Sequence, residues 1–183
     1  MSVTDLLNQE EALVAELYRL GIRHLARLQV GVAARPMPPE DLLAALASHS
    51  QARIQASLIL VFLRHPQLSG ALHAALERLG RQEANALRLY YQAAVYLQRE
   101  LEPELRGQPD RWQLLPDWFS KDLGLPPAQE VRPEAGGATN ALAALGEVHR
   151  RFSGWGYNWA ASYRQNIPWL VRTIRGPDGH LHR

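Results

Sequence analysis

A continuous apolar run at residues 58–63, Leu-Ile-Leu-Val-Phe-Leu, constrains the fold more than any other stretch of this 183-residue chain. It completes a segment, residues 51–64, that starts with polar side chains and has the length of a helix. A helix that is apolar on every side is normally buried. We therefore expect the second half of this segment to be the most buried part of the protein. Pro66 disfavours helical backbone at His65 and should end the helix there.

Two amphipathic segments follow the apolar run and share its core. Pro66 can open a helix that reaches residue 79, with Gly80 behind it as a stop. A longer helix is predicted over residues 82–101, because apolar side chains recur on one face at helical spacing. That inner face consists of Leu87, Tyr90, Ala94, Leu97 and Leu101.

The remaining segments also have helical patterns. Helices are predicted over residues 4–29, 38–48, 139–152 and 158–175, with one or two short helices in residues 111–123 around Pro116 and Gly124 as their stop. No stretch alternates apolar and polar residues in the manner of a strand, so no sheet is expected. The sequence thus predicts an all-α, single-domain multi-helix bundle of about seven to eight helices, with HEAT-like pairs as one possible arrangement.

The domain organisation follows from composition. Residues 1–124 are predicted to form the core helical bundle. Residues 125–138 are rich in proline and glycine and are predicted to be a linker. Residues 139–175 are predicted to form a C-terminal Trp/Arg-rich helical pair packed on the bundle, and residues 176–183 a flexible tail.

Several classes of protein and chemistry are disfavoured by what the sequence lacks. No apolar run approaches the length of a membrane span, and the acidic N-terminal residues do not resemble a signal peptide. Without cysteine there is no disulfide or thiolate metal site. The phosphate-binding patterns GxxxxGK[ST] and GxGxxG are missing, as is the GxSxG pattern of esterases. We therefore expect a cytoplasmic protein with no cofactor and no membrane partner, and we favour a non-enzymatic role.

Five short segments resemble a family of uncharacterised helical bacterial proteins. The likeness covers roughly residues 40–175 and implies a helical fold and a bacterial origin, but no catalytic residue. The segments are Phe62-Leu63-Arg64-His65-Pro66, Tyr91-Gln92-Ala93-Ala94-Val95-Tyr96-Leu97, Leu115-Pro116-Asp117-Trp118-Phe119, Leu123-Gly124-Leu125-Pro126 and Asn158-Trp159-Ala160-Ala161-Ser162-Tyr163.

Arg19 and His24 are weak candidates for catalysis. Their RxxxxH spacing occurs in ribonucleases of the HEPN type, in which a histidine moves protons and an arginine stabilises phosphate. On one continuous helix, however, side chains five residues apart diverge by about 140°. The pair would therefore need a break at Gly21, and the spacing also arises by chance in an arginine-rich chain.

His73 and Glu77 are weak candidates for metal binding. They lie four residues apart on a predicted helix, so both side chains can face one ion. A third ligand would have to come from another part of the chain, from His65, His49 or His24. The alternative is a solvated helical pair, and no metal site is expected.

The C-terminal quarter carries the most suggestive pattern. Residues 139–183 hold six arginines and only two acidic residues, whereas the whole chain has a net charge of +2. Arginine and aromatic side chains alternate there, and this combination is common both at protein interfaces and at surfaces that bind unpaired bases. The predicted partner-binding residues are Arg150, Arg151, Trp155, Tyr157, Trp159, Arg164, Trp169 and Arg172.

Three functions remain open from the sequence. The leading hypothesis is a non-enzymatic interaction protein, an accessory subunit or antitoxin-like partner, that docks a protein partner or a second copy through this C-terminal region. The alternative is a nucleic-acid-binding protein that uses the same region, and the second alternative is a HEPN-like ribonuclease. The tryptophans could also be core residues with solvated arginines beside them, and that interpretation predicts no docking surface.

Overall fold

The structure, a computed structural model, describes residues 3–22, 36–105, 113–131 and 137–153. Within these ranges the regular structure is helical without any strand, which confirms the all-α prediction. None of the helices in these ranges combines the length and the apolarity needed to cross a bilayer. The elements are α1 (Val3–Arg19), α2 (Pro39–Ser48), α3 (Ala52–Gln55), α4 (Ser57–Arg64), η1 (Pro66–Ala71), α5 (Leu72–Glu77), α6 (Arg81–Leu105), η2 (Ala128–Glu130) and α7 (Gly137–Ser153).

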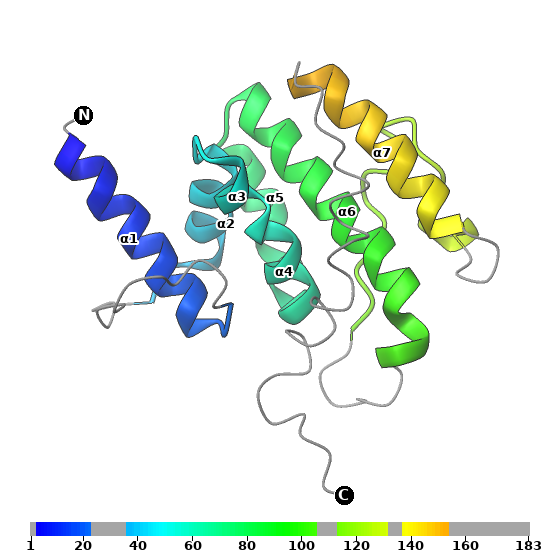
Figure 1. The fold of residues 1–183 in the computed structure, drawn as a ribbon, viewed down its shortest axis with the longest axis horizontal. Helices are drawn as coiled ribbons and strands as arrows, with labels where there is room; N and C mark the ends of the chain where they lie inside the picture. Colours follow the sequence, from blue (N-terminus) through cyan, green and yellow to red (C-terminus); the bar gives the residue numbers. More distant parts are fainter. Residues whose placement is uncertain (1–2, 23–35, 106–112, 132–136, 154–183) are drawn as a thin grey trace, which may run out of the picture.

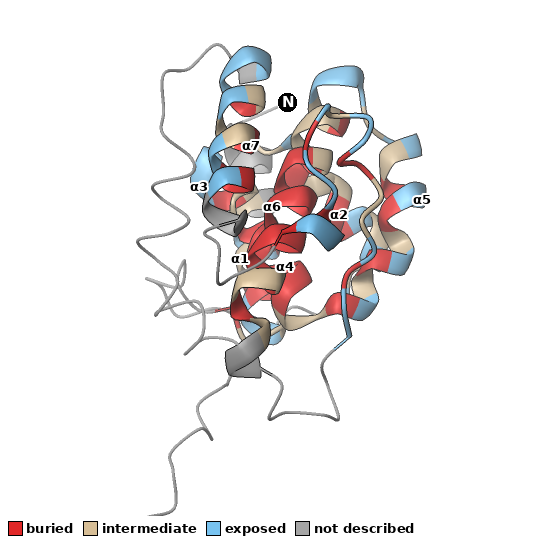
Figure 2. Ribbon diagram, turned by 90° about the vertical axis from the view of Figure 1, so that its right-hand side faces the viewer, coloured by how far each residue is buried: buried red, intermediate tan, exposed pale blue. Residues whose placement is uncertain are grey.

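Helix α4 lies in the interior, as its composition requires. Every residue from Ser57 to Leu63 is buried, and Figure 2 shows α4 and the middle of α6 as the buried centre of the fold. Burying one leucine-sized side chain stabilises a protein by about 2 kcal/mol. Helix α6 packs against α4, and the ring of Phe62 meets the ring of Tyr91 edge-on at 4.9 Å. The apolar run therefore forms the core against the longest described helix.

Helix α1 is shorter than predicted. It ends at Arg19, followed by a turn in which Gly21 has a φ of +76°. The amide of Gly21 donates to the Tyr18 carbonyl at 2.9 Å, and the amide of Ile22 donates to the Leu17 carbonyl at 2.8 Å. This pair of bonds is a Schellman motif, which glycine favours because it has no Cβ. The prediction of one helix over residues 4–29 is therefore wrong beyond Arg19, and residues 23–29 lie outside the described ranges.

Two further predicted helices are divided in the structure. The segment 51–64 forms α3 and α4 with a break at Ala56. The segment 66–79 begins as the 3₁₀ helix η1 and becomes α-helical only at Leu72. The apolar side chains of both segments still reach the core, with Ile54, Leu72 and Ala75 buried and Leu68, Leu76 and Leu79 partly buried against it. Packing against α2 and α6 has therefore overridden the local helical pattern.

The short helices predicted in residues 111–123 are not found in the part that the structure describes. Residues 113–131, called the strap below, contain a turn at residues 119–124 and the short 3₁₀ helix η2. Gly124 has a φ of +66° and ends that turn, which agrees with its predicted role as a stop. Four backbone groups of the strap bond to side chains of α6, while the turn and η2 keep bonds between backbone groups, such as the Leu125 amide to the Ser120 carbonyl at 2.8 Å.

Four side chains of α6 hold the strap. Gln98 donates from Nε2 to the Gln113 carbonyl at 2.8 Å and accepts the Leu115 amide at 2.6 Å. The Tyr91 hydroxyl donates to the Pro116 carbonyl at 2.8 Å, and the Tyr96 hydroxyl donates to the Pro126 carbonyl at 2.7 Å. The fourth side chain, Gln92, donates to Asp117 at 3.0 Å. Tyr91 also packs its ring against Phe62, so the side chains that hold the strap border the contact between α6 and α4.

Within the strap, Asp117 connects several backbone turns. Its carboxylate also accepts the Ser120 hydroxyl at 2.8 Å, the Ser120 amide at 3.3 Å and the Ala128 amide at 2.6 Å. A carboxylate that accepts several amide and hydroxyl bonds organises a loop without regular structure. Asp117 thus fixes both η2 and the preceding turn against α6.

Helix α7 packs antiparallel to α6, on the side of the molecule opposite α1 (Figure 1). Its inner face buries Ala141, Leu142, Leu145 and His149. The predicted domain division remains a prediction. Within the predicted linker, Leu125, Ala128 and Val131 are buried in the common core.

Candidate functional site

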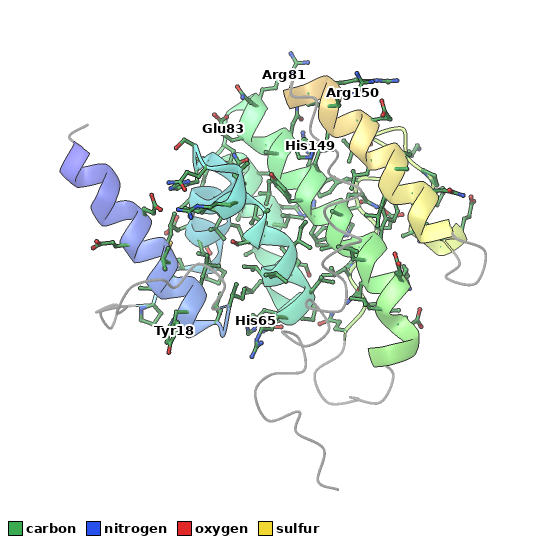
Figure 3. All side chains as sticks on the ribbon, viewed as in Figure 1. Tyr18, His65, Arg81, Glu83, His149 and Arg150 are labelled. Atoms are coloured by element: carbon green, nitrogen blue, oxygen red, sulfur yellow. The ribbon has the colours of Figure 1, made fainter. Side chains whose placement is uncertain are left out.

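The last turn of α7 separates inward and outward side chains. His149 is only 7% exposed, whereas Arg150 and Arg151 are exposed to solvent. The next residue, Phe152, is 50% exposed although its ring is apolar. Figure 3 shows His149 between α6 and α7 and Arg150 at the outer end of α7. This turn therefore presents two guanidinium groups and one aromatic ring at the surface.

One carboxylate lies among these cations. Arg150 donates to Oε2 of Glu147 from Nε at 3.2 Å and from Nη2 at 2.6 Å. The hydrogen bond from Arg150 lowers the pKa of Glu147, with a smaller contribution from the charge of Arg151. Both partners of the ion pair are exposed, so it contributes little to stability. The surface of this turn therefore has mixed charge.

His149 anchors the same turn from inside. Its ring meets the ring of Tyr90, on α6, edge-on at 5.4 Å. Burial lowers the pKa of His149 to about 4, because the imidazolium form would lose its hydration. At neutral pH the ring is therefore uncharged and packs between the helices, while its two neighbours face solvent.

The other predicted docking residues are not part of the described structure. Trp155, Tyr157, Trp159, Arg164, Trp169 and Arg172 all lie in residues 154–183, outside the described ranges. So does the predicted helix over residues 158–175. The docking role of these residues therefore stays a prediction.

Arg19 belongs to an ion pair on α1. Its guanidinium bonds Glu16, with Nε 3.0 Å from Oε2, and Glu16 is only 2% exposed. The hydrogen bond to Glu16 raises the pKa of Arg19. Arg19 and His24 are not on one continuous helix, because α1 stops before Gly21. His24 itself lies outside the described ranges, so its pairing with Arg19 stays a prediction.

His73 and Glu77 are both exposed on α5. The His73 ring packs edge-on against Trp118 of the strap, with 4.8 Å between the ring centres. Among the described residues, no group of three or more His, Asp or Glu side chains could hold a metal ion. The observed role of His73 is thus an aromatic contact between α5 and the strap.

Two histidines considered as a third metal ligand have other contacts. His49 accepts the Gln51 amide on Nδ1 at 3.1 Å, in the connection before α3. Burial lowers the pKa of His49, which keeps this nitrogen available as an acceptor. The Nε2 of His65 lies 2.8 Å from the Leu20 carbonyl and joins the end of α4 to the end of α1.

The polar row on α6 was not predicted from the sequence. Gln92 and Gln98 are almost fully buried in the central part of α6, where their neighbours are mainly apolar or aromatic. Buried amides require hydrogen-bond partners, so two glutamines on the inner side of a helix could have indicated a segment without regular structure nearby. The hydroxyls of Tyr91 and Tyr96 could have indicated such a segment as well. Burial raises the pKa of each tyrosine, and both therefore act as neutral donors.

No protein-family model, curated protein or solved structure matches the chain. The resemblance to a family of helical bacterial proteins therefore stays an expectation from the sequence. The last turn of α7 combines two exposed arginines with an exposed aromatic ring, and it is the starting point for a functional proposal.

Proposed function

We propose that this protein is a non-enzymatic helical interaction protein, an accessory subunit or antitoxin-like partner. It docks through its C-terminal aromatic and arginine-rich region onto a protein partner or a second copy of itself. The observation that supports this role is the exposed last turn of α7, with Arg150, Arg151 and Phe152 facing solvent.

The residue types at this turn suit a protein interface. Arginine and aromatic side chains contribute most often to the central contacts of such interfaces. Arg150 and Arg151 can each bond a carboxylate through two parallel N–H groups. Phe152 would bury its exposed half on binding, which stabilises a complex by about 1 kcal/mol. The inward anchor His149 holds the turn in place before any partner arrives.

A nucleic-acid-binding function is the alternative. It is supported by the same exposed arginine pair and by the aromatic residues that follow it in the sequence. Phosphate contacts release counterions, so such binding weakens steeply as the salt concentration rises. A HEPN-like ribonuclease is the second alternative, supported by the end of α1 at Arg19 and the turn at Gly21, a break that the predicted Arg19–His24 pair requires. Unchanged RNA cleavage after His24→Ala would remove it.

Three finer proposals accompany this function. The antiparallel packing of α6 and α7 supports HEAT-like pairing within a bundle of about seven to eight helices. The resemblance noted in the sequence supports a bacterial origin. The lack of cysteine supports a cytoplasmic location.

The test is the mass and absorbance of the particle isolated from the organism that encodes the chain. Light scattering behind a sizing column, with absorbance at two wavelengths, reports the mass of the particle and its nucleic-acid content. We expect a particle heavier than the single chain with a protein-like absorbance ratio. A nucleic-acid-like ratio that disappears at high salt would favour the alternative, and a clean monomer would refute the proposal.

Variants connect the particle to the site. Arg150→Gln, Arg151→Gln and Phe152→Ser together should release the partner while the circular dichroism spectrum stays helical. Arg53→Gln is the matched control, because Arg53 is an exposed arginine on α3, far from α7 in the sequence. Trp155→Ala and Trp159→Ala give a second test: if they unfold the chain, those tryptophans are core residues.

A further inference from the structure

The start of α6 lies at the same end of the molecule as the last turn of α7. The contact between Tyr90 and His149 sets the register of the two antiparallel helices. Because the helices are antiparallel, both residues lie on the same side of this contact: Arg81 about 13 Å from Tyr90 along the axis, and Arg151 about 3 Å from His149. Figure 3 shows Arg81 and Arg150 together at that end. Residues far apart in the sequence thus lie at one end of the molecule, here called the basic end: Arg81, Arg150, Arg151 and Phe152.

Two guanidinium groups of the basic end have no ion-pair partner among the described residues. Arg81 and Arg151 are exposed, and neither forms an ion pair with a described residue. The nearest acid in the sequence to Arg81, Glu83, folds back over Gly80, with its Oε2 2.6 Å from the position that a Cβ on Gly80 would take. Glu83 thus lies at the N-terminus of α6, where a carboxylate stabilises the helix.

The charges of the basic end distinguish between two classes of partner. A nucleic acid carries closely spaced phosphates and is bound best by a surface of uniform positive charge. Here Glu147 projects an exposed carboxylate beside Arg150, which would repel a continuous polyanion. Discrete carboxylates on a protein can reach Arg81 and Arg151 and avoid Glu147. The exposed ring of Phe152 adds an apolar contact that a phosphate backbone does not use.

From this arrangement we infer that the docking surface extends onto the start of α6, and that its occupant is an acidic protein segment. That segment carries separate carboxylates for Arg81 and Arg151 and an apolar side chain for Phe152. The inference rests on the proposed interaction function and names the chemistry of its partner. Arginine suits this role because its planar group binds a carboxylate through two hydrogen bonds.

The unusual lysine content of the chain provides a direct test. Lys121 is the only lysine, so a carbodiimide, which joins amines to carboxylates without a spacer, finds few amines on this chain. Conjugates formed through amines of the partner appear equally with the parent chain and are subtracted. Arg81→Lys and Arg151→Lys each keep the charge and place one amine in the basic end. Arg53→Lys is the matched control on an exposed part of α3. Each full-length variant is purified with its partner and treated with the carbodiimide, and conjugates are identified by mass.

We expect Arg81→Lys and Arg151→Lys each to form a covalent conjugate with an acidic peptide of the partner, well above the parent chain and Arg53→Lys. Arg81→Gln together with Arg151→Gln should weaken the affinity about tenfold or more, the effect of losing charge-assisted hydrogen bonds. Helical content should not change.

Failure of this inference can be distinguished from failure of the proposed function. If a protein partner is present but conjugates form no better than with Arg53→Lys, the acidic occupant is wrong and the interaction function stands. If the bound species is a nucleic acid, both the acidic partner and the leading function are overturned. If no species is bound, the interaction function fails and this inference fails with it.

Discussion

At the scale of single residues, His149 and Arg150 are neighbours in sequence with opposite surroundings. The histidine ring is buried against Tyr90, while the arginine reaches solvent and pairs with Glu147. Each residue therefore has its own physical consequence. Burial of the neutral histidine makes stability depend on pH, and the exposed arginine is available to a partner.

Because His149 is buried in its neutral form, the fold should become less stable in mild acid. Its pKa is about 4 in the folded protein and near 6.5 when unfolded, so between these values the unfolded chain binds more protons. Stability should therefore fall as the pH drops below about 6.5, by about 3 kcal/mol when pH 4 is reached. Urea unfolding of the parent and of His149→Gln between pH 4 and 7 measures this loss.

The variant should lose much of that pH dependence because glutamine does not titrate. Ala143→Gln, on the exposed face of the same helix, is the control and should keep the parent slope. Equal slopes in His149→Gln and the parent would show that His149 is not responsible.

At the scale of elements, the strap shows how an irregular segment can belong to a core. Four of its backbone groups are satisfied by Gln98, Tyr91 and Tyr96, and the turn and η2 supply backbone bonds of their own. Buried backbone groups without partners are costly, so these side chains are required for the strap to pack at all. The stability of the strap should then depend on single side chains of α6.

Gln98→Ala should loosen the strap and destabilise the protein by about 2–4 kcal/mol, since it leaves the Leu115 amide and the Gln113 carbonyl without partners and opens a cavity. Gln82→Ala, at an exposed position of the same helix, should change stability by less than about 0.5 kcal/mol. Urea unfolding measures both effects.

A protease specific for lysine can report the strap alone, because exposed Lys121 is its only internal lysine target. We expect faster cleavage in Gln98→Ala than in Gln82→Ala under native conditions. Equal cleavage rates would mean that the two hydrogen bonds of Gln98 do not hold the strap.

At the scale of the whole molecule, the helices are not equally deep. Helix α4 and the middle of α6 are buried on all sides, whereas α1 lies at one edge of the bundle (Figure 1). Its described core contacts come from Leu13 and Leu17, with Ile22 just beyond its end, and its polar contacts include His65 and the Gln51–Glu10 bond at 2.8 Å. An element with fewer buried contacts opens at a lower free energy.

Hydrogen exchange should therefore divide the molecule. Amides of α4 and of residues 87–97 in α6 should exchange only through global unfolding, while those of α1 should exchange faster through partial opening. Mass spectrometry of peptic fragments after transfer to deuterated buffer measures both rates. Amides of α1 as slow as those of α4 would show that the bundle opens as one unit.

The sequence by itself determined the helical class and the position of the core. A six-residue apolar run that no polar face interrupts must be buried wherever the helices cross, and α4 is buried accordingly. Proline at residue 66 follows the end of α4 as predicted, because it acts through its own backbone, whereas glycine at residue 124 ends a turn and not the predicted helix. Such local rules do not depend on neighbours elsewhere in the chain.

Only the tertiary structure decided where several elements end and which side chains reach the surface. Gly21 ended α1 where the apolar pattern continued, because the Schellman turn lets Leu17 and Ile22 pack into the core together. The strap forms a turn and η2 in place of its predicted helices, and side chains of α6 bond four of its backbone groups. The inward position of His149 and the placement of Arg81 and Arg150 at one end of the molecule depend on the register of α6 against α7. That register is set by packing between residues about sixty positions apart, which no local pattern in the sequence records.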